Sequence, residues 1–423
     1  MRILLVQNLE YLYYSGGAHK ANRLLMELLS ARGHSCSVVT YLSSDYRSFR
    51  AAAAEYGISG EDLEETDGYF RYVYNGVTVY TCKKEFFVYS FIRDLSRIFE
   101  PELVMVTEDH TGLLMEICLE MPYKVIYLAH TQATLPFGGG DILGNEQERG
   151  KLFEKLDGII TVSRFMRNYI FTWGDIEARA LYFPSYSNTQ IRQLGSFHNR
   201  YVTIINPSGL KGIDIFAETA RQLPQLEFAA VAGWATSEGD LKVLSQIPNV
   251  TLLKAEKEIN KIFAQTRILM VPSLWEEAFG QIIVEAQLSG IPVLSSDVGG
   301  IPEAKCGTDY IIPVQKIEKY NGTGREKGFP EPVVPEQETG DWINAIKKLT
   351  SDETAYETAS KDAMRCAGCF VDQISITDFE EYFKEILAAP VNSRRWENKQ
   401  GGIRNDRKKE RQWKQRAGKY RAE

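Results

Sequence analysis

Cysteine is scarce in this sequence, and long apolar segments are absent from it. Six cysteines are scattered through 423 residues, a usage that favours a reducing cytoplasm over a disulfide framework. No apolar run approaches the roughly eighteen residues that a membrane-spanning helix needs. The apolar start at residues 2–6 gives way to Gln7 and Asn8, so we expect a strand there and not a signal peptide. These absences predict a cytoplasmic protein.

Ligand sets for a metal are also missing. There is no Asp-x-Asp motif, and Cys366 and Cys369 form a C-x-x-C without the second pair that a structural zinc site requires. Two small thiols on a helix are the favoured interpretation, and a zinc or redox site is the alternative. The G-x-G-x-x-G fingerprint of dinucleotide-binding proteins is absent as well. We therefore expect no metal and no cofactor, and an oxidoreductase is disfavoured.

Positive charge is concentrated in the last part of the chain. Residues 391–423 contain twelve Lys or Arg and four Asp or Glu, a net charge of +8, which leaves −15 for the rest of a chain whose formal charge is −7. Too few apolar residues are present there to build a core, so this tail is predicted to be disordered. A solvated tail is the favoured interpretation, and contact with nucleic acid, with the acidic body or with an anionic inner membrane face are the alternatives. We expect no nucleic-acid partner.

Strand and helix patterns alternate along the chain in two series. A polar linker at about 184–199 separates the series, and residues 43–75 are expected to form a peripheral excursion. Two such series predict two doubly wound α/β domains that bind ligands at the carboxyl ends of their parallel strands. The expected strands cover residues 2–7, 37–40, 77–81, 103–107, 125–129, 159–162, 201–205, 228–232, 250–253, 268–271 and 292–295.

The most informative segment runs from Pro272 to Glu303. Glu277 lies in a turn, and Glu285 lies inside an apolar helix pattern, where a lone carboxylate needs a partner. A helix that begins near Gly280 would direct its first N–H groups and the positive end of its dipole at an anion. Carboxylates on either side of such an anion suit the hydroxyl groups that flank the diphosphate of a nucleotide sugar. The alternative is a surface helix whose Glu285 faces solvent.

The segment resembles the E-x7-E signature of retaining glycosyltransferases of the GT-B fold, family 4 (glycosyl transferases group 1). E-A-F-G-Q-I-I-V-E is followed by S-G-I-P-V and then by G-G-I-P-E. The resemblance implies an α/β protein with two doubly wound Rossmann-like domains facing a cleft, and a C-terminal helix that crosses back to the first domain. The implied parts are an acceptor-side domain at 1–188, a linker at 189–199, a nucleotide-sugar-binding domain at 200–375, the closing helix at 376–390 and the basic tail at 391–423.

The resemblance also implies a set of site residues. The catalytic ones would be Glu277, which holds the sugar hydroxyls, and His130, which follows the strand 125–129 and would approach the donor sugar. Lys211 would bind the diphosphate, although this chain has Asn206-Pro207-Ser208 where an arginine is common. The implied donor-binding residues are Gly16, Gly17, Lys211, Ala278, Phe279, Gly280, Gln281 and Glu285.

Each of these positions also has a plain structural interpretation. The double glycine could be ordinary turn chemistry, Lys211 a surface lysine and His130 a loop histidine. Asp109 and His110 follow an earlier strand and are weaker candidates for binding the acceptor.

The implied activity is the transfer of a sugar from a UDP- or GDP-linked donor to a hydroxyl of an unidentified acceptor. It would proceed with retention of anomeric configuration and without a metal. The alternatives are a nucleotide-sugar epimerase of the same fold and a non-catalytic nucleotide-sugar-binding protein. An incubation with donor alone separates the epimerase from the transferase.

Overall fold

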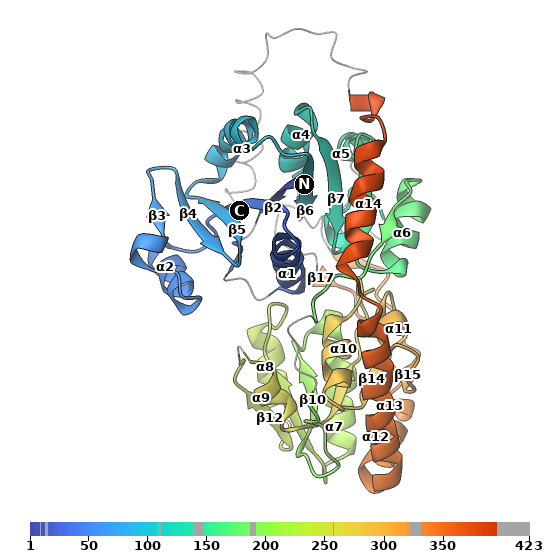
Figure 1. Ribbon diagram of the computed structural model, residues 1–423. Helices are drawn as coiled ribbons and strands as arrows, with labels where there is room; N and C mark the ends of the chain where they lie inside the picture. The colour runs from blue at the N-terminus through green and yellow to red at the C-terminus, as the bar shows by residue number, and fades with distance from the viewer. Residues whose placement is uncertain are drawn as a thin grey trace. The chain divides into compact units, whose positions relative to one another are not determined.

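The computed structural model describes residues 1–8, 10–12, 16–107, 109, 111–138, 147–186, 192–256, 258–321 and 331–395. They form two compact α/β units, whose elements are labelled in Figure 1. Unit 1 contains the described residues up to 186 together with 375–395, and unit 2 contains those from 192 to 374.

A nine-stranded, mostly parallel sheet forms the centre of unit 1, in the order β3-β4-β5-β2-β1-β6-β7-β8-β9. Its middle strands are almost entirely buried, as expected for apolar strands covered by helices on both faces. The strands are β1 (Arg2–Gln7), β2 (Ser35–Tyr41), β3 (Glu64–Glu65), β4 (Tyr69–Tyr74), β5 (Val77–Cys82), β6 (Leu103–Thr107), β7 (Lys124–Ala129), β8 (Gly158–Thr161) and β9 (Arg179–Ala180). The helices are α1 (Gly17–Ala31), α2 (Tyr46–Glu55), α3 (Glu85–Phe99), α4 (Leu113–Glu120), α5 (Gln147–Phe153), α6 (Arg164–Gly174) and α14 (Ile376–Ala388), with short 3-10 turns η1 (Gly60–Asp62), η2 (Gln132–Thr134) and η4 (Ser393–Arg395).

Residues 43–75 are more regular than the sequence predicts. They contain α2 and β4, and β4 extends the sheet by pairing antiparallel with β5. Phe70 and Tyr72 are buried on one face of β4, where the ring of Phe70 stacks on Phe49 of α2 at 4.8 Å. The segment reads Y-F-R-Y-V-Y, and its aromatic residues on both faces hide the alternation that marks a half-buried strand.

Unit 2 is built on a six-stranded parallel sheet in the order β12-β11-β10-β13-β14-β15. The unit also contains the short antiparallel pair β16 (Tyr320–Asn321) and β17 (Glu331–Pro332). The parallel strands are β10 (Tyr201–Ile205), β11 (Glu227–Val231), β12 (Val250–Leu253), β13 (Thr266–Val271), β14 (Val293–Ser296) and β15 (Ile311–Ile312). The helices are α7 (Ile213–Gln222), α8 (Glu238–Ser245), α9 (Asn260–Phe263), α10 (Gln281–Leu288), α11 (Ile301–Ala304), α12 (Gly340–Ser351) and α13 (Glu353–Asp372), with a 3-10 turn η3 (Gly209–Lys211).

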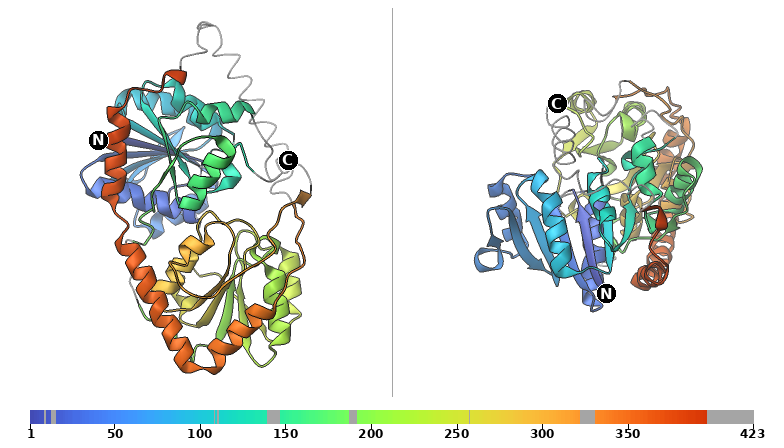
Figure 2. Two further views of the ribbon diagram at one scale, coloured as in Figure 1. Left: turned by 90° about the vertical axis from the view of Figure 1, so that its right-hand side faces the viewer. Right: turned by 90° about the horizontal axis from the view of Figure 1, so that it is seen from above.

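The predicted closing helix is present as α14, which belongs to unit 1 (Figures 1 and 2). Phe379 packs edge-on against Phe183, with ring centroids 5.3 Å apart. The carboxylate of Glu380 accepts two bonds from the guanidinium of Arg32, at 3.1 and 2.7 Å, and lies 2.9 Å from Nε2 of His34. Apolar packing therefore attaches α14 to the segment that follows β9, and a bidentate ion pair attaches it to the C-terminal turn of α1.

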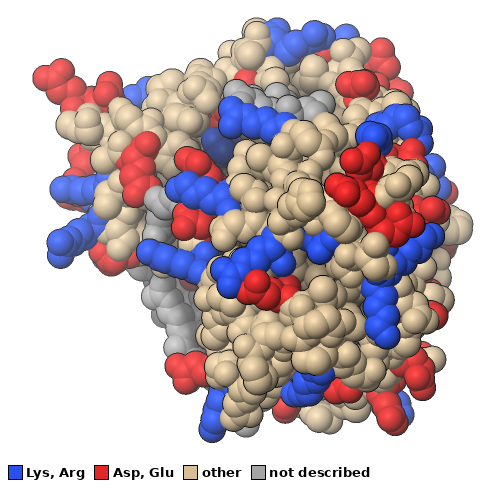
Figure 3. All heavy atoms as spheres, turned by 90° about the horizontal axis from the view of Figure 1, so that it is seen from below, with Lys and Arg blue, Asp and Glu red and all other residues tan. Residues whose placement is uncertain are grey.

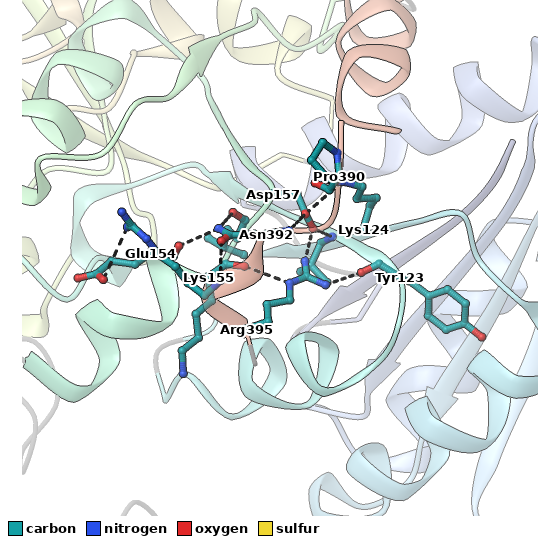
Figure 4. Close-up of polar contacts among 11 residues, drawn as sticks. Tyr123, Lys124, Glu154, Lys155, Asp157, Pro390, Asn392 and Arg395 are labelled. Carbon is teal, nitrogen blue, oxygen red and sulfur yellow. Dashed lines mark hydrogen bonds and ion pairs between the residues drawn. The ribbon is translucent and has the colours of Figure 1, made fainter. Parts of the chain in front are cut away.

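Folded structure continues past the predicted boundary at residue 390. The Arg395 side chain is buried in unit 1, where it pairs with Asp157 and donates to the carbonyl oxygens of Tyr123 (2.6 Å) and Lys155 (3.1 Å), as Figure 4 shows. A guanidinium with partners for its donors can be buried in a way that a free charge cannot. The prediction that disorder begins at 391 is wrong for residues 391–395, and the rest of the tail lies outside the described residues.

Candidate active site

Lys211, Ser273 and Glu277 meet at the carboxyl edge of the unit 2 sheet. Oε1 of Glu277 forms an ion pair with Nζ of Lys211 and accepts a hydrogen bond from Oγ of Ser273 at 2.7 Å. The Lys211 and Glu277 side chains are 19% and 18% exposed, so solvent and ligands can reach them. The structure thus joins two of the predicted site residues directly and adds Ser273, which the sequence analysis did not single out.

A glycine allows Lys211 to approach Glu277 from a distant part of the chain. Gly212 has φ +73°, and a Cβ there would lie 1.9 Å from the carbonyl oxygen of Pro272. The carbonyl oxygen of Leu210 accepts hydrogen bonds from the N–H groups of Leu274 (2.9 Å) and Trp275 (3.2 Å). Only glycine fits this left-handed, crowded position. The K-G pair therefore docks the turn η3 on the segment that follows β13.

The second glycine pair supports the backbone of Glu277. The N–H of Gly300 donates to the carbonyl oxygen of Glu277 at 2.7 Å. A Cβ on Gly299 would lie 2.5 Å from that same oxygen, and one on Gly300 would lie 2.4 Å from the carbonyl oxygen of Ala278. The G-G-I-P-E element therefore holds the turn in front of α10 in place, and Pro302 then opens α11.

The N-terminus of α10 can accept an anion. Gly280 is the N-cap at φ +106°, no side chain caps the helix, and its first turn holds no acidic residue. Its initial N–H groups, beginning near Gln281, therefore meet the requirement for binding a phosphate. Glu285 is half-exposed one turn further along. The ring of Phe279 is buried against Phe370 of α13, with centroids 5.7 Å apart, so only its backbone can serve a ligand.

His130 lies in unit 1 and is held by a chain of amides. Nε2 of His130 is 2.7 Å from Oδ1 of Asn22, and the Asn22 amide donates to Oε1 of Gln7 at 3.3 Å. Because Asn22 offers its oxygen to the ring, Nε2 carries the proton and Nδ1 is the acceptor nitrogen. The ring also packs on Phe183, with centroids 4.7 Å apart.

Burial keeps this imidazole neutral. Removal from water, reinforced by the nearby ring of His19, lowers the pKa of His130 from 6.5 to about 3. Burial likewise lowers the pKa of His19 to about 4. At neutral pH His130 can therefore exchange hydrogen bonds but does not act as a cation.

Gly16 and Gly17 start α1, the helix that carries His19 and Asn22. Gly16 is its N-cap in extended conformation, at φ −80°, and has no side chain to cap the helix. The double glycine therefore leaves the first N–H groups of α1 uncovered by a side chain.

Asp109 is a helix cap and not a ligand-binding group. Its carboxylate is 2% exposed and accepts hydrogen bonds from the N–H groups of Met115 (2.7 Å) and Gly112 (2.9 Å). Burial raises its pKa, against the effect of those bonds. The hypothesis that Asp109 binds the acceptor is therefore disfavoured, and His110 lies outside the described residues.

A cavity of about 550 Å³ adjoins the turn that holds Glu277. It lies at the ends of β14 and β15, and its lining includes Glu276, Asp297, Gly299, Lys316 and Lys319. Nζ of Lys316 is 3.0 Å from the carboxylate of Glu276. The volume suits a small ligand, and the cavity brings charges of both signs next to Glu277. The sequence carries no motif that assigns a site there.

None of the described helices is both long and apolar enough to cross a membrane. Among the same residues, no group of three or more His, Cys, Asp or Glu is arranged to hold a metal ion. Positive and negative side chains are interspersed over most of the face drawn in Figure 3.

Comparison with known proteins finds a sequence family that matches part of the second half of the chain. Residues 201–352 match the sequence model of the family described as glycosyl transferases group 1. An uncharacterized 42.6 kDa protein from the cps region of Klebsiella pneumoniae is 24% identical over 336 residues, which cover 72% of this chain and 87% of that protein. The D-inositol 3-phosphate glycosyltransferase of Mycobacterium leprae is 32% identical over 105 residues, 22% of this chain and 24% of that enzyme.

Solved structures share the whole fold at low sequence identity. A glycosyltransferase from Rickettsia africae superposes with a TM-score of 0.62 at 13% identity, covering 92% of this chain and 100% of that one. Alr3699/HepE of Anabaena, crystallised with UDP, gives a TM-score of 0.60 at 16% identity, covering 92% and 99%. The predicted α/β fold class, that of the GT-B glycosyltransferases, is confirmed.

Proposed function

We propose that this protein transfers a sugar from a nucleoside diphosphate sugar to an acceptor hydroxyl, because residues 201–352 match the sequence model of the glycosyl transferases group 1. The observation that carries the proposal is the meeting of Lys211, Ser273 and Glu277 in front of α10. A cation, a carboxylate and an uncapped helix N-terminus are the groups needed to hold a sugar diphosphate. A related fold has been crystallised with UDP and with UDP-glucose, which supports a UDP-linked donor over a GDP-linked one.

The diphosphate would bind between Lys211 and the first N–H groups of α10. Without donor, Lys211 is neutralised by Glu277. A diphosphate carries more charge than one carboxylate and would take over Nζ of Lys211, which would leave Glu277 to hold hydroxyl groups of the sugar. The ion pair thus keeps both side chains in place until the donor arrives, and no metal is needed to neutralise the leaving group.

A donor bound in this way gives Glu285 and His130 their roles. Glu285, one turn along α10, would bind the ribose hydroxyls. His130, neutral and fixed by Asn22, would accept a hydrogen bond from a sugar hydroxyl at Nδ1. Transfer would proceed with retention through a short-lived oxocarbenium-like ion, and the leaving phosphate would take the proton of the attacking hydroxyl. The bond between the anomeric carbon and the phosphate oxygen breaks, and a bond between the anomeric carbon and the acceptor oxygen forms in its place.

The donor can be identified without knowing the acceptor. UDP-, GDP- and ADP-sugars are tested for protection against thermal unfolding, since a ligand that binds only the folded state raises the melting temperature. Lys211→Ala should weaken binding of the protecting donor about 10- to 100-fold, the loss of a charged hydrogen bond. Lys347→Ala, an exposed lysine on α12, is the matched control.

Two outcomes would overturn the proposal. If no nucleotide sugar protects the wild-type protein, it has no donor of this class. If Lys211→Ala binds the donor as tightly as wild type, the diphosphate lies elsewhere. Release of an isomerised sugar from donor alone, with no acceptor present, would favour the epimerase.

A further inference from the structure

Trp234 exposes its indole at the carboxyl edge of the unit 2 sheet. It follows β11, and 71% of its surface is accessible. A large aromatic ring left in water forgoes the free energy of burial. The ring stands in the same row of strand ends that carries Lys211 and Glu277.

The backbone on both sides of Trp234 is fixed. Asn206 adopts φ +61°, and its Oδ1 accepts hydrogen bonds from the N–H of Ala235 (2.8 Å) and from Oγ1 of Thr236 (3.3 Å). A Cβ on Gly233 would lie 2.6 Å from the Asn206 side chain, so that position admits only glycine. The ring is therefore presented from a rigid turn. Asn206 thus builds the turn that carries the aromatic ring.

The position of the ring relative to Lys211 indicates which part of a donor it meets. Nζ of Lys211 lies 5.8 Å from the centre of the Trp234 ring. In the sheet order, β11 flanks β10 on one side and β13, which precedes Glu277, flanks it on the other. Trp234 and Glu277 thus lie on opposite sides of Lys211. In a nucleoside diphosphate sugar, the base and the sugar lie on opposite sides of the diphosphate.

We propose that Trp234 is the platform on which the nucleobase of the donor stacks. This inference rests on the proposed function, because it requires a nucleotide donor whose diphosphate is held by Lys211. Stacking acts on the π-face that every base has, so the ring contributes affinity for the nucleoside and does not choose the base. Phenylalanine would retain part of the contact, and alanine would remove it.

Calorimetric titration with UDP and with pyrophosphate, which has no base, tests the assignment. Trp234→Ala should weaken UDP binding about 10-fold or more and leave pyrophosphate binding unchanged. Trp234→Phe should lie between alanine and wild type. Asn206→Gly, which keeps the left-handed backbone and removes the clamp, should also weaken only UDP. Lys211→Ala should weaken both ligands, and Trp173→Ala, an exposed tryptophan of unit 1 (49%), should weaken neither.

The titrations distinguish a failure of the stacking role from a failure of the proposed function. Unchanged UDP affinity in Trp234→Ala overturns the stacking role while leaving the proposed function intact. Equal losses of UDP and pyrophosphate also overturn it, because the ring would then act through Lys211. If a different nucleotide sugar protects the wild type, its nucleoside diphosphate replaces UDP in the same titrations. If no nucleoside diphosphate binds the wild type, the proposed function fails, and the role of Trp234 fails with it.

Discussion

Replacing Arg395 by alanine is expected to destabilise unit 1 by about 3 kcal/mol. The Arg395 side chain is 0% exposed, and its partner Asp157 is 3% exposed. Removing one member of a buried ion pair costs about 3–5 kcal/mol, because the other charge stays buried without compensation. Nζ of Lys124 lies 3.4 Å from the carboxylate of Asp157 and supplies part of that compensation. The lower end of the range therefore applies.

The assay is differential scanning calorimetry of the whole chain. One kcal/mol shifts the melting temperature of a unit of this size by about 2–4 °C, so the unit 1 transition should fall by about 6–12 °C. Arg394→Ala is the matched control, since that side chain is 61% exposed and lies 3.9 Å from Glu154. Its loss should cost less than about 0.5 kcal/mol. Hydrogen exchange should become faster along α14 in Arg395→Ala and not in Arg394→Ala.

A second variant tests whether the uncompensated buried charge of Asp157 causes the loss of stability. In Asp157→Asn/Arg395→Met, the charges of the pair are removed, while an amide oxygen at position 157 can still accept from the N–H of Val125 and from Nζ of Lys124. Part of the lost stability should therefore return. Equal melting temperatures for Arg395→Ala and Arg394→Ala would refute the role of the buried pair. A double variant no more stable than Arg395→Ala would show that hydrogen bonds to the carbonyl groups dominate instead.

Three further predictions concern the site and the attachment of α14. Glu277→Ala should abolish sugar transfer without lowering the melting temperature, whereas Glu276→Ala, which removes the contact with Lys316, should retain activity; wild-type rates in Glu277→Ala would refute its role. Asn22→Asp places a carboxylate beside His130 and should raise the pKa of that ring from about 3 by about 1–3 pH units; NMR titration of the imidazole measures it, and an unchanged value would contradict the geometry. Hydrogen bonding to the Arg32 guanidinium, followed by that to His34, lowers the pKa of Glu380 from 4.5 to about 2. The stabilising effect of Glu380 is therefore fully present above about pH 4.5 and lost as the pH falls toward 2, so the melting temperatures of wild type and Glu380→Gln should converge in that interval; a constant difference would argue against it.

Most parallel strands of both units could be predicted because each is a short apolar run followed by a turn, whereas the two-residue strands β9 and β15 are too short to give such a pattern. β1 and β7, buried on both faces, are of this kind. β4 was missed because aromatic residues occupy both of its faces. The ordered stretch up to Arg395 was missed because its charges were assigned to a solvated tail, and only the fold supplies the buried partner Asp157.

The candidate site, like the fold, could be predicted only in part from the sequence. Local spacing placed Glu277 and Lys211 at strand ends, but the ion pair between them depends on β10 and β13 being neighbours in the sheet. Trp234 carried no motif, and the hydrogen bond from Ala235 to Asn206 that fixes its turn arises because β11 pairs with β10. The sequence motifs therefore identified the residues nearest to α10, while the strand order determines which others join them.

Unit 1 is assembled from both ends of the chain, and this affects how the protein can be made. A ribosome adds about 5–20 residues per second, so roughly 10–40 seconds separate the synthesis of Phe183 from that of Arg395. Unit 2 has emerged by then, whereas the nascent first unit still lacks α14 and leaves Phe183 and Arg32 without their partners Phe379 and Glu380. Unit 1 is thus the first unit to be synthesised and the last to be completed. During this interval its uncovered apolar surface is accessible to chaperones.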